Sequence, residues 1–188
     1  CWAHARRKFS DAIKNDRERA ESALEQIQLL YEVERQIKDQ ALCFEEAAKL
    51  RVRLAYPIMV RFEKWLVAEH AKVIKGSPIE KAILYTYNRF NKLSRYHLDG
   101  RYNIDNNGIE NAARPVAVGR KNYLFCQNDD TAESTAIIYS FMGCCKAAKV
   151  NFRTWMIYFL DHVHDYDQDY TRDIAELLPD NLKDAGVL

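Results

Sequence analysis

The sequence predicts a mainly α-helical protein. Its 188 residues include 11 Tyr and 8 Phe but only 6 Gly and 4 Pro. Because turn-rich β folds need many glycines at their tight turns, this composition favours helices. Apolar residues make up 48% of the chain and charged residues 29%, a balance that can bury a core and is typical of a globular protein rather than a disordered one.

Apolar residues recur every three or four positions through the first hundred residues, which predicts long amphipathic helices. We expect one helix over 9–42 and a second over about 44–74. Pro57 should kink the second helix or start a new one, because its ring displaces an intrahelical hydrogen bond. The Ser-Pro pair at 77–78 is an N-cap followed by a first-turn proline, and it predicts a third helix to about Leu93.

The pattern then breaks into shorter pieces. Residues 101–104 are expected to be extended, and Asn107-x-x-Glu110 has the spacing of a capping box, which predicts a short helix. Pro115 lies too deep for an ideal helix, so a kink or break is expected near it. Residues 119–122 have the composition of a turn.

The last part of the chain predicts two further helices. Asp130-x-x-Glu133 has the spacing of a capping box and should start a helix that runs to about Lys149. Asn151 is expected to cap the final helix. The acidic remainder, 165–188, is expected to pack loosely.

Charge is unevenly distributed although the formal net charge is only +1. The start of the chain is basic and residues 161–169 are acidic, which fits a protein that meets a polyanion with one region only. Solvated helix faces of opposite sign explain the same pattern equally well. The five cysteines form no C-x-x-C pair, so neither a disulfide framework nor a zinc site is indicated, and a reducing cytoplasm is the default location. No stretch approaches the length of a membrane span, so no membrane partner is expected.

Two sequence blocks are more specific than an amphipathic helical pattern. The first is Cys1-Trp2-Ala3-His4-Ala5-Arg6-Arg7-Lys8-Phe9, in which residues 1–4 are expected to be a strand. The second is Asp105-Asn106-Asn107-Gly108-Ile109-Glu110, followed by Arg114-Pro115-Val116-Ala117-Val118-Gly119-Arg120-Lys121-Asn122-Tyr123-Leu124-Phe125. Together these blocks resemble the transposases of insertion-sequence family sixty-six, a group of bacterial mobile elements, and the similarity spans most of the chain.

The resemblance implies the C-terminal part of a ribonuclease H-like core, interrupted by a long helical insertion and containing only short strand segments. The family's catalytic triad is two aspartates and one glutamate (DDE), and both aspartates lie upstream of the Cys-Trp-Ala-His block. Because the chain begins at Cys1, we expect it to be a fragment that lacks both aspartates and is inactive alone. The expected division is a core strand and helix start at 1–13, a helical insertion at 14–100, the glutamate helix and a core helix at 101–150, and a C-terminal helix with an acidic tail at 151–188.

Glu110 matches the glutamate of the family's Asn-Asn-x-x-Glu pattern and is therefore expected to be a catalytic metal ligand. Phosphodiester cleavage is well served by two Mg²⁺ ions about 4 Å apart, held by carboxylate oxygens. Two ions are expected in the complete enzyme and none in this chain alone. The alternative is that Glu110 only caps its helix, and whether Asp105 adds a ligand stays open. The sequence departs from the family at Asn111, where Arg is common, and at Cys126-Gln127, which replace a small Gly/Ser pair.

Basic and polar residues in both blocks are candidates for phosphate contacts, which need positive charge and donors but no base reading. They are Arg6, Arg7, Lys8, Arg114, Arg120, Lys121 and Asn122. The alternative is ordinary surface charge or pairing with acids such as Asp105. His4 either packs beside Trp2 or lies next to the active site.

The expected function of the parent protein is cleavage and joining of transposon-end DNA. Its partners would be transposon-end DNA, target DNA and further copies of itself, in the bacterial cytoplasm and associated with the nucleoid. The alternative is a non-catalytic helical module that binds DNA or another subunit.

Overall fold

The computed structural model describes residues 1–169 and 171–188, and the chain divides into two compact units, Cys1–Asn107 and Gly108–Leu188. Every regular element in the described residues is helical, so the mainly α prediction is confirmed. The expected short strand segments are wrong for these residues. The ribonuclease H-like core stays a prediction, as does the four-part division, whose last segment includes Tyr170, outside the described residues.

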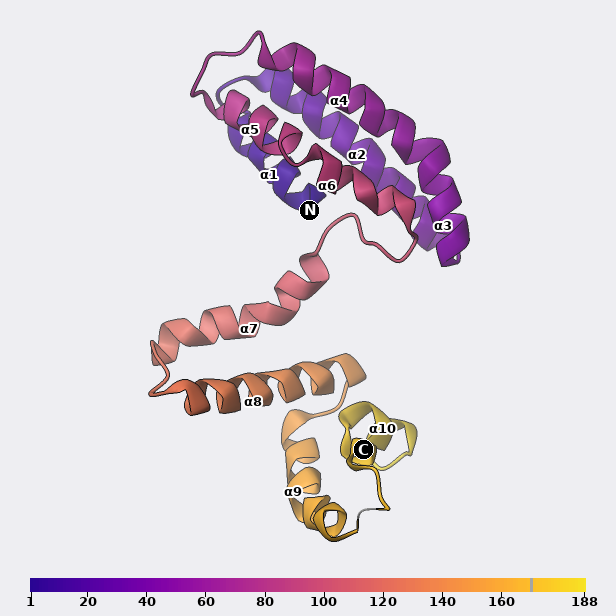
Figure 1. Cartoon of the computed structure of the whole chain (residues 1–188), viewed down its shortest axis with the longest axis vertical. Coiled ribbons are helices and arrows are strands. Elements are labelled where there is room, and N and C mark those ends of the chain that lie inside the picture. Colours follow the sequence, from indigo (N-terminus) through magenta and orange to yellow (C-terminus); the bar gives the residue numbers. More distant parts are fainter. Residues whose placement is uncertain (170) are drawn as a thin grey trace. The chain divides into compact units, whose positions relative to one another are not determined.

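The first unit is a bundle in which α1 packs against α2 and α5, and α4 packs against α2 and α5 (Figure 1). Its elements include a π-helical turn, η1, and a 3₁₀ turn, η2. In chain order they are α1 (Trp2–Ala12), α2 (Arg17–Asp39), α3 (Phe44–Leu50), η1 (Arg51–Ala55), α4 (Tyr56–His70), α5 (Pro78–Tyr87), α6 (Phe90–Leu93) and η2 (Ser94–Leu98).

Aromatic side chains form the centre of this bundle. Phe62 of α4 lies 6.1 Å from the ring of Trp2, 6.1 Å from that of Phe9 and 5.7 Å from that of Trp65, measured between centroids. Full burial of a Phe side chain contributes about 1.5–3 kcal/mol, so Phe62 stabilises the unit by an amount of this order. The indole Nε1–H of Trp2 donates to the carbonyl of Leu93 at 3.0 Å, which satisfies a buried donor.

The first four residues do not form the expected strand, because the block that contains them is helix α1. Trp2, Ala5, Phe9 and Ala12 are all fully buried. Their spacing of three and four residues places them on one face of a helix, whereas a strand would bury alternate residues. The segment 101–104 was expected to be extended, but it consists of a turn and bends and contains no strand. It packs at the start of α1, where the backbone N–H of Trp2 donates to the carbonyl of Ile104 at 3.2 Å.

The predicted helix over 9–42 is two helices. Asp16 ends the first run and caps α2, since its carboxylate accepts the backbone N–H of Arg19 at 3.1 Å. The second predicted helix runs from Phe44 to His70 with a π-helical turn in the middle. That turn ends directly before α4, and Pro57 lies in the first turn of α4. The proline therefore marks a new helix start, which is one of the two outcomes expected for it.

Local capping signals in the rest of the first unit are confirmed. Ser77 caps α5, with its Oγ accepting the backbone N–H of Glu80 at 3.2 Å, and a proline occupies the first turn. The helix ends at Tyr87, and α6 completes the predicted run to Leu93 after a short break.

The second unit consists of α7 (Asn107–Tyr123), α8 (Asp129–Ala148), α9 (Phe152–Gln168), η3 (Ile174–Leu177) and α10 (Pro179–Asp184), with α7 beginning on the last residue of the first unit. Trp155 of α9 is fully buried, and its Nε1–H donates to the carbonyl of Leu177 at 2.8 Å. Leu182 of α10 joins the same cluster. The expectation of loose packing is therefore wrong for 174–184.

Three predictions about α7 and α8 need correction. The glutamate helix is not short, because α7 continues through Pro115 and includes 119–122, which were expected to form a turn. Its ribbon bends in the N-terminal half (Figure 1). Helix α8 is capped by Asn128, whose side chain accepts the backbone N–H of Thr131 at 2.8 Å, rather than by a box beginning at Asp130. Asn151 caps α9 as predicted.

Candidate functional site

Glu110 lies in the first turn of α7, and its side chain is exposed. The N-terminus of a helix carries a partial positive charge that attracts anionic groups. An ionised carboxylate offers the hard oxygen donors that Mg²⁺ prefers. The chemistry of Glu110 therefore fits a metal ligand, and that role stays a prediction.

The residues just before α7 are held by a pair of hydrogen bonds to Asp105. Its Oδ1 accepts the backbone N–H of Asn107 at 3.1 Å, and its Oδ2 accepts the hydroxyl of Tyr31 at 3.0 Å. Burial raises the pKa of Tyr31, and the bond to Asp105 raises it further. Both carboxylate oxygens of Asp105 are thus engaged within the chain, which favours a structural role over the metal role that the sequence left open.

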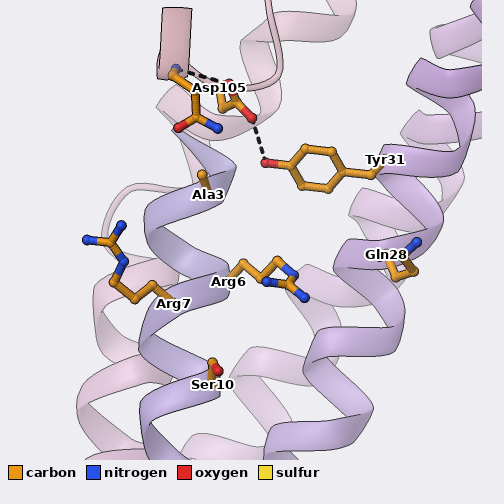
Figure 2. A pocket seen from close by; sticks show the side chains of 8 residues that line it. Ala3, Arg6, Arg7, Ser10, Gln28, Tyr31 and Asp105 are labelled. Atoms are coloured by element: carbon orange, nitrogen blue, oxygen red, sulfur yellow. Dashed lines mark hydrogen bonds between the residues drawn. The ribbon is translucent and has the colours of Figure 1, made fainter. Parts of the chain in front are cut away.

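Asp105 and Tyr31 help to line a pocket of about 480 Å³ in the first unit. Figure 2 shows Arg6 extending from α1 toward α2, and Arg7 extending from α1 away from α2. Neither arginine forms an ion pair with any residue that the structure describes. The full lining is Ala3, Arg6, Arg7, Ser10, Gln28, Tyr31, Asp105 and Asn107.

Lys8 points into a different environment from Arg6. Its Nζ lies 5.8 Å from the ring centroid of Tyr85, and the guanidinium of Arg89 lies 4.2 Å from the same centroid. Residues two apart on a helix are separated by about 200° around its axis. The three predicted phosphate contacts of the first block therefore do not gather in one place: Arg6 and Arg7 line the pocket, and Lys8 does not.

The predicted contacts of the second block are all exposed on α7. Arg114 and Lys121 are seven residues apart, which places them on the same face two turns apart. Arg120 and Lys121 lie in the last turn, where the helix dipole favours positive charge. Asn122 follows them directly. The structure therefore presents this group along one helix in the second unit.

His4 lies on α1 and is partly buried. It is one turn before both Arg7 and Lys8, because residues three and four apart are neighbours on a helix. Whether it serves the active site stays a prediction.

Sequence reasoning missed Tyr31, Gln28 and Ser10 as neighbours of the basic block. Tyr31 belongs to the apolar pattern of its helix, and its partner Asp105 lies 74 positions away in sequence. The only available signal was helical periodicity, since Ala3, Arg6, Arg7 and Ser10 share one face of α1.

No helix in the described part of the chain combines the length and apolarity needed to cross a bilayer. No solved structure matches the chain. Three curated proteins of Sinorhizobium fredii (strain NBRC 101917 / NGR234) are similar to it. The uncharacterized protein y4hP is 31% identical over 99% of the chain and 35% of its own length. The uncharacterized protein y4qI is 31% identical over 100% of the chain and 34% of its own length. The uncharacterized protein y4jD is 30% identical over 97% of the chain and 35% of its own length.

The chain thus spans about a third of the length of the curated relatives it matches. The model of the transposase IS66 family matches residues 1–134. This match covers well over half of the chain and contains both sequence blocks that carry the resemblance. The chain belongs to the IS66 family of transposases.

Proposed function

We propose that this chain is the part of a DNA transposase that supplies the glutamate of a DDE triad, and that this glutamate is Glu110. The observation that carries the proposal is the position of Glu110: it stands in the Asn-Asn-x-x-Glu motif within the family match and in the first turn of a helix. The side chain of Glu110 is exposed there.

The proposed reaction is cleavage and joining of transposon-end DNA. Bound Mg²⁺ would act as a Lewis acid on the phosphodiester and on the attacking oxygen. Glu110 would contribute one anionic oxygen ligand from a fixed helix terminus, which limits the motion of the ligand. The two aspartates would come from the remainder of a protein about as long as the curated relatives, so this chain alone is proposed to be inert.

DNA would be held by phosphate contacts from two places. Arg6 and Arg7 offer guanidinium groups with no described ion pair, and α7 offers Arg114, Lys121 and their neighbours Arg120 and Asn122. Contacts of this kind position the duplex without reading its sequence. The proposed partners are transposon-end DNA, target DNA and further copies of the protein, in the bacterial cytoplasm and at the nucleoid.

The alternative is a helical module that binds DNA or another subunit without catalysis. The two functions are separated by Glu110→Gln in the full-length transposase that contains this chain. The substitution keeps size and removes charge, so Mg²⁺-dependent strand cleavage should fall at least a hundredfold, on the order of 3 kcal/mol of transition-state stabilisation. Binding to transposon-end DNA should stay within about twofold.

Glu133→Gln is the matched control, because Glu133 is an exposed glutamate near the start of the next long helix. It should cleave as the unmodified protein does. Cleavage retained in Glu110→Gln would refute the catalytic assignment and favour the non-catalytic module.

A further inference from the structure

We infer that the pocket between α1 and α2 is a binding site for one DNA backbone phosphate, with Arg6 supplying the charge and Gln28 and Ser10 supplying neutral donors. The inference rests on the proposed DNA contacts at the start of the chain. It goes beyond them in two ways. It assigns a defined pocket, and it gives α2, in the expected helical insertion, a direct part in holding DNA.

The lining residues come from one face of each helix. On α1, Ala3, Arg6, Arg7 and Ser10 are spaced by three and four residues, and on α2, Gln28 and Tyr31 are spaced by three. The side chain of Arg6 extends into the space between the two helices (Figure 2).

The arginine is available to an external anion. Five arginines of the first unit are engaged by carboxylates: Arg17, Arg19, Arg35, Arg51 and Arg101 each lie within 3.3 Å of a carboxylate oxygen. Arg6 is exposed and forms no ion pair within the described part of the chain. A guanidinium in a pocket that hydroxyl and amide side chains also line suits a phosphate, which accepts several hydrogen bonds at once.

The pocket also contains one acid, Asp105, but the two arginines of the lining outweigh its single negative charge. Asp105 accepts the Tyr31 hydroxyl at 3.0 Å and the Asn107 backbone N–H at 3.1 Å. These donors hold the carboxylate at the pocket wall. The positive charge of Arg6 acts on the same hydroxyl, where it opposes the rise in the pKa of Tyr31 that burial and Asp105 cause.

The test uses the chain itself and a short fluorescein-labelled duplex of arbitrary sequence, with affinity measured by fluorescence anisotropy at several salt concentrations. Arg6→Ala should weaken binding about tenfold and reduce the slope of log K against log salt by about 0.9, the value for one lost phosphate contact. Gln28→Ala should weaken binding about threefold to tenfold, as expected for a neutral hydrogen bond, and leave the slope unchanged. Gln28→Glu should weaken binding further, because it places a second carboxylate in the pocket.

Two matched controls keep the test specific. Gln36→Ala changes an exposed glutamine of the same helix outside the pocket, and Arg61→Ala removes an exposed arginine of α4. Both should bind DNA within about twofold of the unmodified chain. Thermal unfolding of every variant reports whether the bundle is intact.

The results separate this inference from the proposed function. If Arg6→Ala and Gln28→Ala match their controls while Arg120→Ala weakens binding, the pocket assignment is wrong and DNA binding through α7 stands. If the unmodified chain binds no duplex at all, both the pocket and the proposed DNA contacts of this chain fail. Loss in both pocket variants with unchanged thermal stability supports the inference.

Discussion

Replacement of Arg51 by methionine should destabilise the first unit more than any exposed substitution. Arg51 begins the π-helical turn and is 3% exposed. Its Nε and Nη2 donate to the two carboxylate oxygens of Glu34 at 2.9 and 2.7 Å. Its Nη1 donates to the carbonyls of Tyr96 and Asp99, both at 3.0 Å. One side chain thus ties η1 to α2 and to the segment that follows α6.

The magnitude follows from what the substitution leaves behind. Methionine fills a similar length but offers no donor, so the Glu34 carboxylate and two carbonyls lose their partners. Breaking a buried ion pair by removing one partner costs about 3–5 kcal/mol. The exposed Arg53→Met is the control, and surface changes of this kind stay within about 0.5 kcal/mol. The double variant Arg51→Met/Glu34→Met should be more stable than Arg51→Met alone, because it removes the unpaired charge as well.

Native-state amide hydrogen exchange is the appropriate assay, because it reports the free energy of opening of each helix separately in a chain with two compact units. Amides of α2 and α4 should lose protection in Arg51→Met, and those of α8 and α9 should not. Equal protection in Arg51→Met and Arg53→Met would refute the reasoning that this ion pair ties the bundle together.

Three further predictions follow from local geometry. Gly100→Ala should lower the thermal unfolding midpoint, since a Cβ at this position would overlap the backbone carbonyl of Phe44; an unchanged midpoint would contradict the close approach. Hydrogen bonds from Arg101 lower the pKa of Asp99 to about 2. Because the folded-state pKa lies below the ordinary value, this carboxylate stabilises the fold above about pH 4 and the contribution is lost as pH falls toward about 2, which acid titrations with and without Arg101→Ala should show. Asn128→Ala should lower the free energy of unfolding by about 1 kcal/mol, measured with denaturant, because the helix loses its N-cap. The control Asp130→Ala should lower it by less, because Asp130 is not the cap.

Much of the helical fold was predictable because its signals are local. Ser77 and Asn151 cap their helices through hydrogen bonds that span three residues, so short sequence patterns contain all the information. The spacing of Trp2, Ala5 and Phe9 also indicates a helix. The strand prediction for residues 1–4 considered four residues in isolation, and the periodicity over Trp2–Ala12 was the better guide.

The contacts that build the candidate pocket were not predictable, because they join distant segments. Tyr31 and Asp105, which meet in the pocket lining, are 74 residues apart. Periodicity assigns Tyr31 to a buried stripe but does not identify its partner. Similarly, Arg6, Arg7 and Lys8 are consecutive in the sequence and were treated as one basic group. On the helix, Lys8 lies near the ring of Tyr85, whereas Arg6 lines the pocket.

The central claim, that Glu110 is a metal ligand, is tested most directly by metal rescue in the full-length transposase that contains this chain. Glu110→Cys replaces a hard oxygen donor with a softer sulfur donor, which disfavours Mg²⁺ more than Mn²⁺. We predict that this variant does not cleave transposon-end DNA with Mg²⁺ and recovers cleavage with Mn²⁺, whereas Glu133→Cys cleaves with either ion. Full activity of Glu110→Cys with Mg²⁺, or no recovery with Mn²⁺, would contradict the assignment.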